Sequence, residues 1–235
     1  MKKIALLLIM VLFSGTTPVM AVPYLQLDTS DGIYNNGDET IYATTNPFTL
    51  FALVNGTSEF YTPGTTYYIS AAITPKLAEG ATLANAYFEF DGSHIDVTED
   101  MIFGAPPILD VDKELQSHGI FDTYYAEFAF TLDAGKKAAE YNTQDNPGGL
   151  TSAPDGTLFY EDFLVSVFLP EGYGVHFDLY TLTFDGKKTG IDQFAPFSHD
   201  AQSSTAPVPE PASLLLLATG LIGVAGFGRK KFGRV

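Results

Sequence analysis

Short segments rich in Tyr, Phe, Val, Ile and Thr recur along this chain, and turn-forming residues separate them. Such segments favour β-strands, because aromatic and β-branched side chains pack well on a pleated surface. Examples lie at residues 39–44, 47–54, 66–74, 83–91, 122–132, 162–169 and 175–184. The turn signals between them include Asn55-Gly56, Pro63-Gly64, Asp91-Gly92, Asp155-Gly156 and Asp185-Gly186. This pattern predicts an all-β fold.

Hydrophobic and polar residues alternate within several of these segments. Phe88 and Phe90 alternate with Tyr87, Glu89 and Asp91, which is the period of a strand with one buried face. We therefore predict an antiparallel β-sandwich, of jelly-roll or immunoglobulin-like topology. Two stretches break the rhythm, and we expect short helices in loops around residues 113–117 and 134–141. Residues 142–157 are expected to form a long surface loop, the kind of segment that carries binding function.

Composition limits how this fold is stabilised and what it binds. The chain has no cysteine, so hydrophobic burial must stabilise it without disulfides. It has 28 acidic and 12 basic residues, for a net charge of −16, which excludes nucleic acid as a partner because phosphates would be repelled. We expect one body domain at residues 22–200, large enough to bury about 70% of its unfolded surface.

The N-terminus has the three-part plan of a secretory signal peptide. Lys2 and Lys3 precede an apolar run at residues 4–13, and small or apolar residues follow up to Ala21. The run of about ten apolar residues is too short for a membrane span, which needs roughly 20. We predict that residues 1–21 are a signal peptide, cleaved between Ala21 and Val22.

The C-terminus combines a linker, a proline-rich motif, an apolar run and a basic end. We assign residues 201–207 to a Ser/Thr/Pro linker and residues 208–235 to a sorting signal with a transmembrane helix at 212–228. The motif is Val208, Pro209, Glu210 and Pro211, and the basic residues are Arg229, Lys230, Lys231 and Arg234. An apolar helix of about 25 Å suffices for a thin bilayer. Because basic residues stay on the cytoplasmic side, the acidic body is expected outside the inner membrane.

This order of motif, apolar run and basic end closely resembles the PEP-CTERM sorting signal of Gram-negative bacteria. The resemblance implies recognition by an exosortase, a membrane-embedded cysteine transpeptidase that cuts near the motif and releases or re-anchors the body. It also implies a cell surface or extracellular matrix rich in polysaccharide as the destination. One departure is that Phe232 and Gly233 interrupt the basic cluster. A proline linker ahead of an ordinary membrane anchor remains the alternative.

The start of the body resembles a second family. Residues 24–28, 31–41 and 48–53 are similar to the exported bacterial family called choice-of-anchor N. Its members share an N-terminal body and differ in their C-terminal sorting device. This resemblance implies no enzymatic activity.

Acidic residues gather in three runs that we considered as calcium sites. The runs are Asp28-Asp31-Asp38-Glu39, Asp91-Asp96-Glu99-Asp100 and Asp110-Asp112-Glu114. Calcium needs six to eight converging oxygens, and none of the runs fits the EF-hand loop. Aspartates in turns more often cap the backbone or face solvent, so calcium remains an alternative here and no metal ligand is assigned.

Other patterns of catalytic or binding residues are weak. The four histidines, at positions 94, 118, 176 and 199, are far apart and form no metal-binding pattern. The chain has neither a cysteine nucleophile nor a Gly-x-Ser-x-Gly elbow. Distant carboxylates can act together in glycoside hydrolysis. The pairs Tyr67-Tyr68 and Tyr124-Tyr125 could form a sugar-stacking platform, although alternating aromatics in strands are usually core on one face and rim on the other.

These observations favour a non-enzymatic, exported surface or extracellular-matrix protein that an exosortase sorts. Its partners would be the exosortase and the inner membrane, with no cofactor and no catalytic residue. One alternative is a polysaccharide-binding module, with or without calcium. The other is a glycoside hydrolase that uses two carboxylates.

Overall fold

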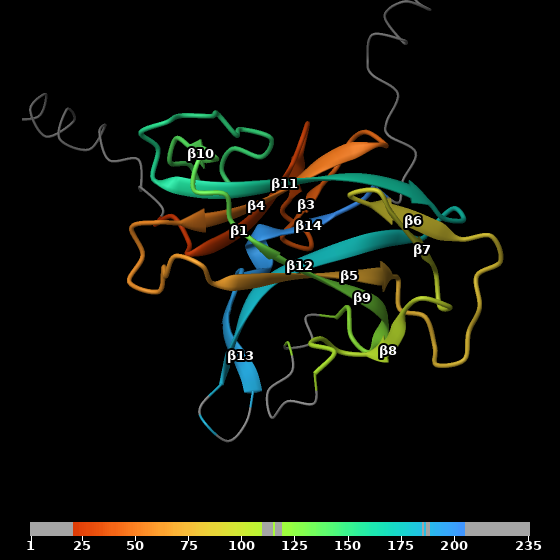
Figure 1. Ribbon diagram of the computed structural model, residues 1–235. Helices are drawn as coiled ribbons and strands as arrows, with labels where there is room; N and C mark the ends of the chain where they lie inside the picture. The colour runs from red at the N-terminus through yellow and green to blue at the C-terminus, as the bar shows by residue number, and fades with distance from the viewer. Residues whose placement is uncertain (1–20, 110–114, 116–118, 185, 187–188, 205–235) are drawn as a thin grey trace, which may run out of the picture.

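The computed structural model describes residues 21–109, 115, 119–184, 186 and 189–204. In this part of the chain, two β-sheets stack face to face as a sandwich (Figure 1). The first sheet has the order β1 (Leu25–Thr29), β4 (Phe48–Asn55), β11 (Leu158–Phe168), β6 (Tyr87–Phe90) and β7 (Ser93–Asp96), with β10 (Lys137–Ala138) paired to β11. The second has the order β2 (Ile33–Asn35), β3 (Thr40–Tyr42), β14 (Asp200–Gln202), β12 (Gly174–Phe184), β5 (Thr66–Thr74), β9 (Thr123–Thr131) and β8 (Ile102–Gly104), with β13 (Thr189–Phe194) paired to β12. The prediction of an all-β sandwich is confirmed.

The predicted alternation appears in the burial of the strands. In β6, Phe88 and Phe90 are buried, Tyr87 is half-buried and Glu89 is exposed. The segment expected at 66–74 forms β5 with the same bounds. The strands differ from the predicted pattern in one pairing, because β3 and β14 run parallel to each other.

The prediction of a helix at residues 134–141 is wrong. Its residues form a turn followed by β10. The N–H of Lys136 donates to the carbonyl of Asp133, and the N–H of Ala139 donates to the carbonyl of Thr151, so the backbone pairs with a later loop instead of with itself. Most of the helix expected at 113–117 lies outside the described residues. Among the described residues, the one helix is the 3-10 turn η1 (Phe197–His199).

The main core lies between the two sheets and is rich in phenylalanine. Phe48 of the first sheet meets Phe177 of the second edge to face, with ring centroids 6.2 Å apart. Phe90 stacks on Phe128 at 4.0 Å in the same core. Fully burying one such side chain contributes about 1.5–3 kcal/mol, which is how a chain without disulfides holds two sheets together.

A smaller apolar cluster lies on the outer face of the second sheet. It consists of Ala72, Leu115, Phe121 and Tyr125, and Ile120 packs against it. Tyr125 belongs to β9 and Ala72 to β5, whereas Leu115 and Phe121 come from the segment between β8 and β9. This part of the outer face of the second sheet is therefore a buried surface.

The loop at 142–157 folds back onto β1. The N–H of Gly148 donates to Asp28 Oδ1 at 2.8 Å, and the hydroxyl of Tyr141 donates to Asp28 Oδ2 at 2.7 Å. The N–H of Thr143 donates to Gln26 Oε1 at 3.0 Å. Asp28 and Gln26 are fully buried as a result, so part of the expected surface loop is a packed cover.

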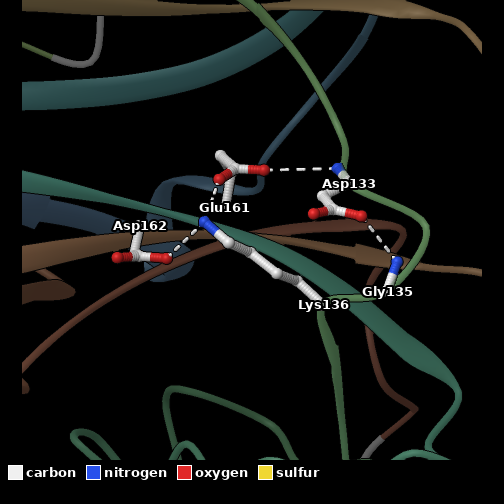
Figure 2. A network of polar contacts seen from close by, with 5 residues as sticks. All are labelled: Asp133, Gly135, Lys136, Glu161 and Asp162. Carbon is white, nitrogen blue, oxygen red and sulfur yellow. Dashed lines mark hydrogen bonds and ion pairs between the residues drawn. The ribbon is translucent and has the colours of Figure 1, made fainter.

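A polar network fixes the turn between β9 and β10 to β11 (Figure 2). The ammonium group of Lys136 contacts Glu161 and lies 2.7 Å from Asp162 Oδ1. Glu161 also accepts the N–H of Asp133 at 3.2 Å. The hydrogen bond from Lys136 to Asp162, and to a smaller extent the one to Glu161, raises the pKa of this lysine. The ammonium group therefore stays charged.

The sheet continues into the range that we expected to be linker. Residues 201 and 202 belong to β14, and Ser203 is also buried. The Oγ of Ser203 accepts the N–H of Val175 at 2.8 Å. The folded body therefore extends at least to residue 203, and the expected C-terminal helix lies outside the described residues.

Candidate functional site

Two residues of β12 point away from the main core on the same side of the strand. Val175 and Phe177 belong to the core between the sheets, so His176 and Asp178 face outward, because side chains alternate along a strand. The antiparallel pairing of β12 with β14 places Phe177 opposite Ala201. This register brings Asp200 to the same face as His176 and Asp178.

The three side chains form a compact buried cluster. His176 Nε2 lies 3.6 Å from Asp178 Oδ1 and 3.7 Å from Asp200 Oδ2. The exposed fractions of His176, Asp178 and Asp200 are 1%, 2% and 1%. Their three ligand atoms all lie within 4.8 Å of one another. Among the described residues, no other group of three or more His, Cys, Asp or Glu side chains has the geometry to hold a metal ion.

Neighbouring side chains orient the cluster. His176 Nδ1 lies 3.3 Å from Gln202 Oε1, and this contact turns Nε2 toward the two carboxylates. The hydroxyl of Ser70 donates to Asp178 Oδ2 at 2.9 Å, which leaves Oδ1 facing the imidazole. The positions of the three groups are therefore set from β5 and β14 as well as from β12.

The cluster concentrates negative charge in a buried site. Burial disfavours a charged imidazole, but the carboxylates of Asp178 and Asp200 outweigh burial and raise the pKa of His176 to about 10. The pKa of Asp200 is raised, mainly by burial and to a smaller extent by the nearby charge of Asp178. Two carboxylates around one imidazole nitrogen form an environment that favours a positive charge at Nε2, either a proton or a metal ion.

The spacing of the histidines in the sequence predicts that His176 is isolated, and the structure corrects this prediction, because His176 lies beside Asp178 and Asp200. The motif His176-Phe177-Asp178 lies in a predicted strand, and a spacing of two residues in a strand puts both polar side chains on one face. The spacing of His176 and Asp178 was therefore enough to predict a polar pair on one face of the strand, and this prediction was missed. Asp200 carried no such signal, because it lay at the edge of the range assigned to the linker.

The other described histidines have different environments. His94 is exposed and lies 3.2 Å from Asp96 Oδ1. His199 is buried, with Nε2 3.0 Å from Asn142 Oδ1, and burial lowers its pKa to about 4. His118 lies outside the described residues.

The acidic runs were candidates for calcium sites. In the part of the chain that the structure describes, they do not come together as metal ligands. Asp28 is buried beneath the loop at 142–157, whereas Asp31 and Asp38 are exposed. In the second run, Asp100 Oδ2 accepts the N–H of Asp96 at 2.9 Å, which is a turn contact. The third run lies outside the described residues.

The tyrosine pairs do not form the sugar-stacking platform that was the alternative for them. Tyr67 is buried in the main core and Tyr125 in the smaller cluster. Tyr68 stacks on Tyr180 at 5.8 Å, and the hydroxyl of Tyr124 accepts the N–H of Gly80. Adjacent residues of a strand face opposite sides, so only one tyrosine of each pair can face a given surface.

A different aromatic group lies on the outer face of the first sheet. Tyr87 stacks on Phe168 with ring centroids 4.6 Å apart, and His94 packs on the same tyrosine at 4.5 Å. Phe168 is 45% exposed, and Glu89 of the same face is exposed. We call Phe168, Tyr87 and His94 the aromatic strip.

The C-terminal tail matches a known sorting motif. Residues 207–230 match the model of the PEP-CTERM protein-sorting motif, which confirms that resemblance and implies export and surface sorting in a Gram-negative bacterium. The predicted motif residues Val208, Pro209, Glu210 and Pro211 and the basic residues Arg229 and Lys230 lie inside this range. The predicted Lys231 and Arg234 follow it, and all of them lie outside the described residues.

Further comparisons add little about the body. No curated protein matches the chain, and the resemblance to choice-of-anchor N is not confirmed. The solved structure of ACE19, the collagen binding subdomain of Enterococcus faecalis surface protein ACE, covers 79% of this chain and 99% of that chain with 10% identity and a TM-score of 0.25. A TM-score this low supports no inference about fold or function.

The predicted N-terminal cleavage site borders the described part of the chain. Ala21 is exposed, and Val22 packs against the buried cluster of Leu53, Ala138 and Leu158. Cleavage between Ala21 and Val22 stays a prediction. Within the described ranges, no helix is both long and apolar enough to cross a membrane.

Proposed function

We propose that this chain is an exported surface or extracellular-matrix protein with a non-enzymatic body, which an exosortase processes at Pro209-Glu210-Pro211. The observation that carries the proposal is the match of residues 207–230 to the PEP-CTERM sorting motif. The folded body reaches Ser203, so only a few residues separate it from the motif. A signal peptide at the N-terminus and a membrane helix at the C-terminus would deliver the body to the outside of the inner membrane.

The chemistry of the motif supports processing beside the membrane. Pro209 and Pro211 fix the backbone near φ −65° and offer no N–H donors, which favours an extended segment. A protease binds its substrate most readily in an extended form, and the basic end at Arg229, Lys230 and Lys231 would hold the tail on the cytoplasmic side. The body, with most of the 28 acidic residues, would be presented outside.

The burial of the polar cluster argues against Asp178 and Asp200 as the catalytic pair of a glycoside hydrolase. A glycoside hydrolase needs two carboxyl groups that flank a sugar in an accessible cleft. Asp178 and Asp200 are 2% and 1% exposed, so a sugar chain has no access to them in this fold. A pocket of about 200 Å³ lies elsewhere, beside Asn46, Tyr173 and Ser204, and is smaller than the roughly 300–1,000 Å³ of most ligand sites.

Mass spectrometry of the mature protein from a host with an exosortase tests the proposal. The wild-type chain should end near the motif and lack residues 212–235. Glu210→Ala should retain the tail, because the anionic residue between the prolines is removed. Glu171→Ala, a change at an exposed carboxylate of the body, is the matched control and should be processed normally. Recovery of a peptide spanning the motif and the basic end from most wild-type molecules would mean that the tail is an ordinary anchor.

A second candidate function is polysaccharide binding, and the aromatic strip favours it. Sugar rings pack on exposed aromatic faces, and the carboxylates of Glu89 and Asp96 on the same two strands can accept hydrogen bonds from sugar hydroxyls. Binding on a glycan array should be lost in Phe168→Ala. Phe184→Ala is the control, because this residue is 66% exposed but lies on β12, outside the strip. A uniformly negative array for the wild-type chain would remove this candidate.

A further inference from the structure

We propose that His176, Asp178 and Asp200 bind one small divalent transition-metal ion of the Zn²⁺ class, and that this ion fastens β14 to β12. The site would be structural. It goes beyond the proposed function, because sorting at the motif requires no metal in the body.

The spacing of the three ligand atoms suits a bound cation. The distances from His176 Nε2 to the carboxylate oxygens, 3.6 and 3.7 Å, exceed the roughly 3.2 Å limit of ordinary N–H···O hydrogen bonds. Two ligands bound to one zinc ion at about 2.0–2.2 Å, at tetrahedral to trigonal angles, lie about 3.4–3.7 Å apart. The separations therefore suit a shared cation better than a shared proton.

The imidazole of His176 faces in a direction that also suits a bound cation. Gln202 Oε1 accepts hydrogen bonds and does not donate them, so the contact at 3.3 Å places a proton on His176 Nδ1. Nε2 then faces two carboxylate oxygens. A neutral ring would present a lone pair to these oxygens, which is repulsive, so Nε2 must carry a proton or bind a cation, and the separations of 3.6 and 3.7 Å favour the cation. Metal-bound histidines commonly donate their other N–H to an oxygen in this way.

The number and type of the ligands select the class of metal. Calcium takes six to eight oxygen ligands, and magnesium keeps several waters. The cluster offers one nitrogen and two oxygens in a site where each residue is at most 2% exposed. Zinc accepts imidazole and carboxylate ligands and needs only four, so the three side chains and one water would complete its coordination.

The location gives the site its role. Asp200 belongs to the last described strand, which leads toward the sorting tail, whereas His176 and Asp178 belong to a central strand of the sheet. A shared ion would join these strands in a chain that has no cysteine for a disulfide. Because the folded state would bind the metal and the unfolded chain would not, the metal would stabilise the fold.

The test uses the full chain, purified in detergent and freed of metal with a chelator. Isothermal titration with Zn²⁺ should show one ion bound per chain, and thermal unfolding should shift upward by several degrees. Asp200→Asn and Asp178→Asn should weaken binding at least tenfold. Asp96→Asn is the matched control, because Asp96 forms an exposed pair with His94 and should leave binding unchanged.

A measurement on the wild-type chain keeps the proposal testable if a variant fails to fold. Co²⁺ should give the visible absorption of a four-coordinate site, and Zn²⁺ should abolish it. Saturable binding that survives in folded Asp200→Asn would overturn the proposal. So would a wild-type chain that shows neither a cobalt spectrum nor zinc binding, since the cluster would then be a proton-mediated ion pair, and so would a preference for Ca²⁺ over Zn²⁺.

Discussion

At the scale of single residues, Asp28 shows how one buried carboxylate holds a loop. Its two oxygens accept hydrogen bonds from the N–H groups of Thr29 and Gly148 and from the hydroxyl of Tyr141. Burial outweighs these bonds and raises the pKa of Asp28 to about 6. The folded chain therefore holds a proton on this side chain at pH values where the unfolded chain has lost it.

This pKa predicts that Asp28 makes the fold less stable as pH rises. The unfolded chain releases the proton near pH 3.8 and the folded chain near pH 6. The contribution to the free energy of unfolding is therefore full below pH 4, falls between pH 4 and 6, and is lower by roughly 3 kcal/mol above that range. Asp28→Asn removes the titrating group, so its denaturant unfolding should lose this part of the slope.

The control for this prediction is Asp31→Asn, a change at an exposed residue of the following turn. This variant should keep the pH dependence of the wild-type chain. Identical slopes in all three proteins between pH 4 and 6 would show that Asp28 does not titrate in this range.

At position 156, the surrounding backbone leaves room only for a glycine. A Cβ at this position would lie 1.9 Å from the carbonyl oxygen of Ala138, and backbone cannot move aside as a flexible side chain can. We expect Gly156→Ala to lower the free energy of unfolding by about 2 kcal/mol or more. Gly37→Ala, where the nearest atom is a side-chain oxygen of Asn35 at 3.3 Å, should change it little. Equal urea midpoints for the two variants would contradict this account.

At the scale of elements, β14 is short but central. It pairs with β12 antiparallel and with β3 parallel, and it therefore links strands from opposite ends of the chain. Its three residues are all buried. The sequence pattern did not predict this strand, because three residues are too few to show alternation. The Ser and Thr residues that follow it are also typical of a linker.

A pair of truncations tests the importance of β14. A chain that ends after Ser204 keeps β14 and the contact of Ser203 with Val175, and it should unfold at the temperature of the full chain. A chain that ends after Ala195 loses η1 and β14, leaves an edge of β12 unpaired, and should lose the cooperative transition or unfold more than about 10 °C earlier. Scanning calorimetry compares the two. Equal transition temperatures would mean that the fold ends before β14.

At the scale of the whole molecule, the net charge of −16 opposes a compact fold. Repulsion among surface carboxylates destabilises the folded state and is screened by salt. Raising the ionic strength from about 0.01 to 0.15 M should therefore raise the unfolding temperature by a few degrees. Choline chloride should act as sodium chloride does, since screening does not depend on the cation. A lower or unchanged unfolding temperature in both salts would refute this prediction.

The strands and the sorting tail were accessible from the sequence because both are local patterns. Alternation along a strand follows from backbone geometry over neighbouring residues, so the bounds of β5 and the burial of Phe88 and Phe90 were predictable. The PEP-CTERM motif is a contiguous run, and residues 207–230 match it. The prediction of a short helix at 134–141 failed because those residues pair with the loop that follows them.

The tertiary structure alone decided which distant residues meet. Asp200 reaches His176 because β14 pairs with β12 across the chain, and Asp28 is buried because a loop more than a hundred residues away closes over it. Such pairings depend on the packing of the two sheets and on strand register, which no local period encodes. The sequence by itself thus determined the long strands and the address at the tail, whereas the short strand β14 and the candidate metal cluster exist only in the folded molecule.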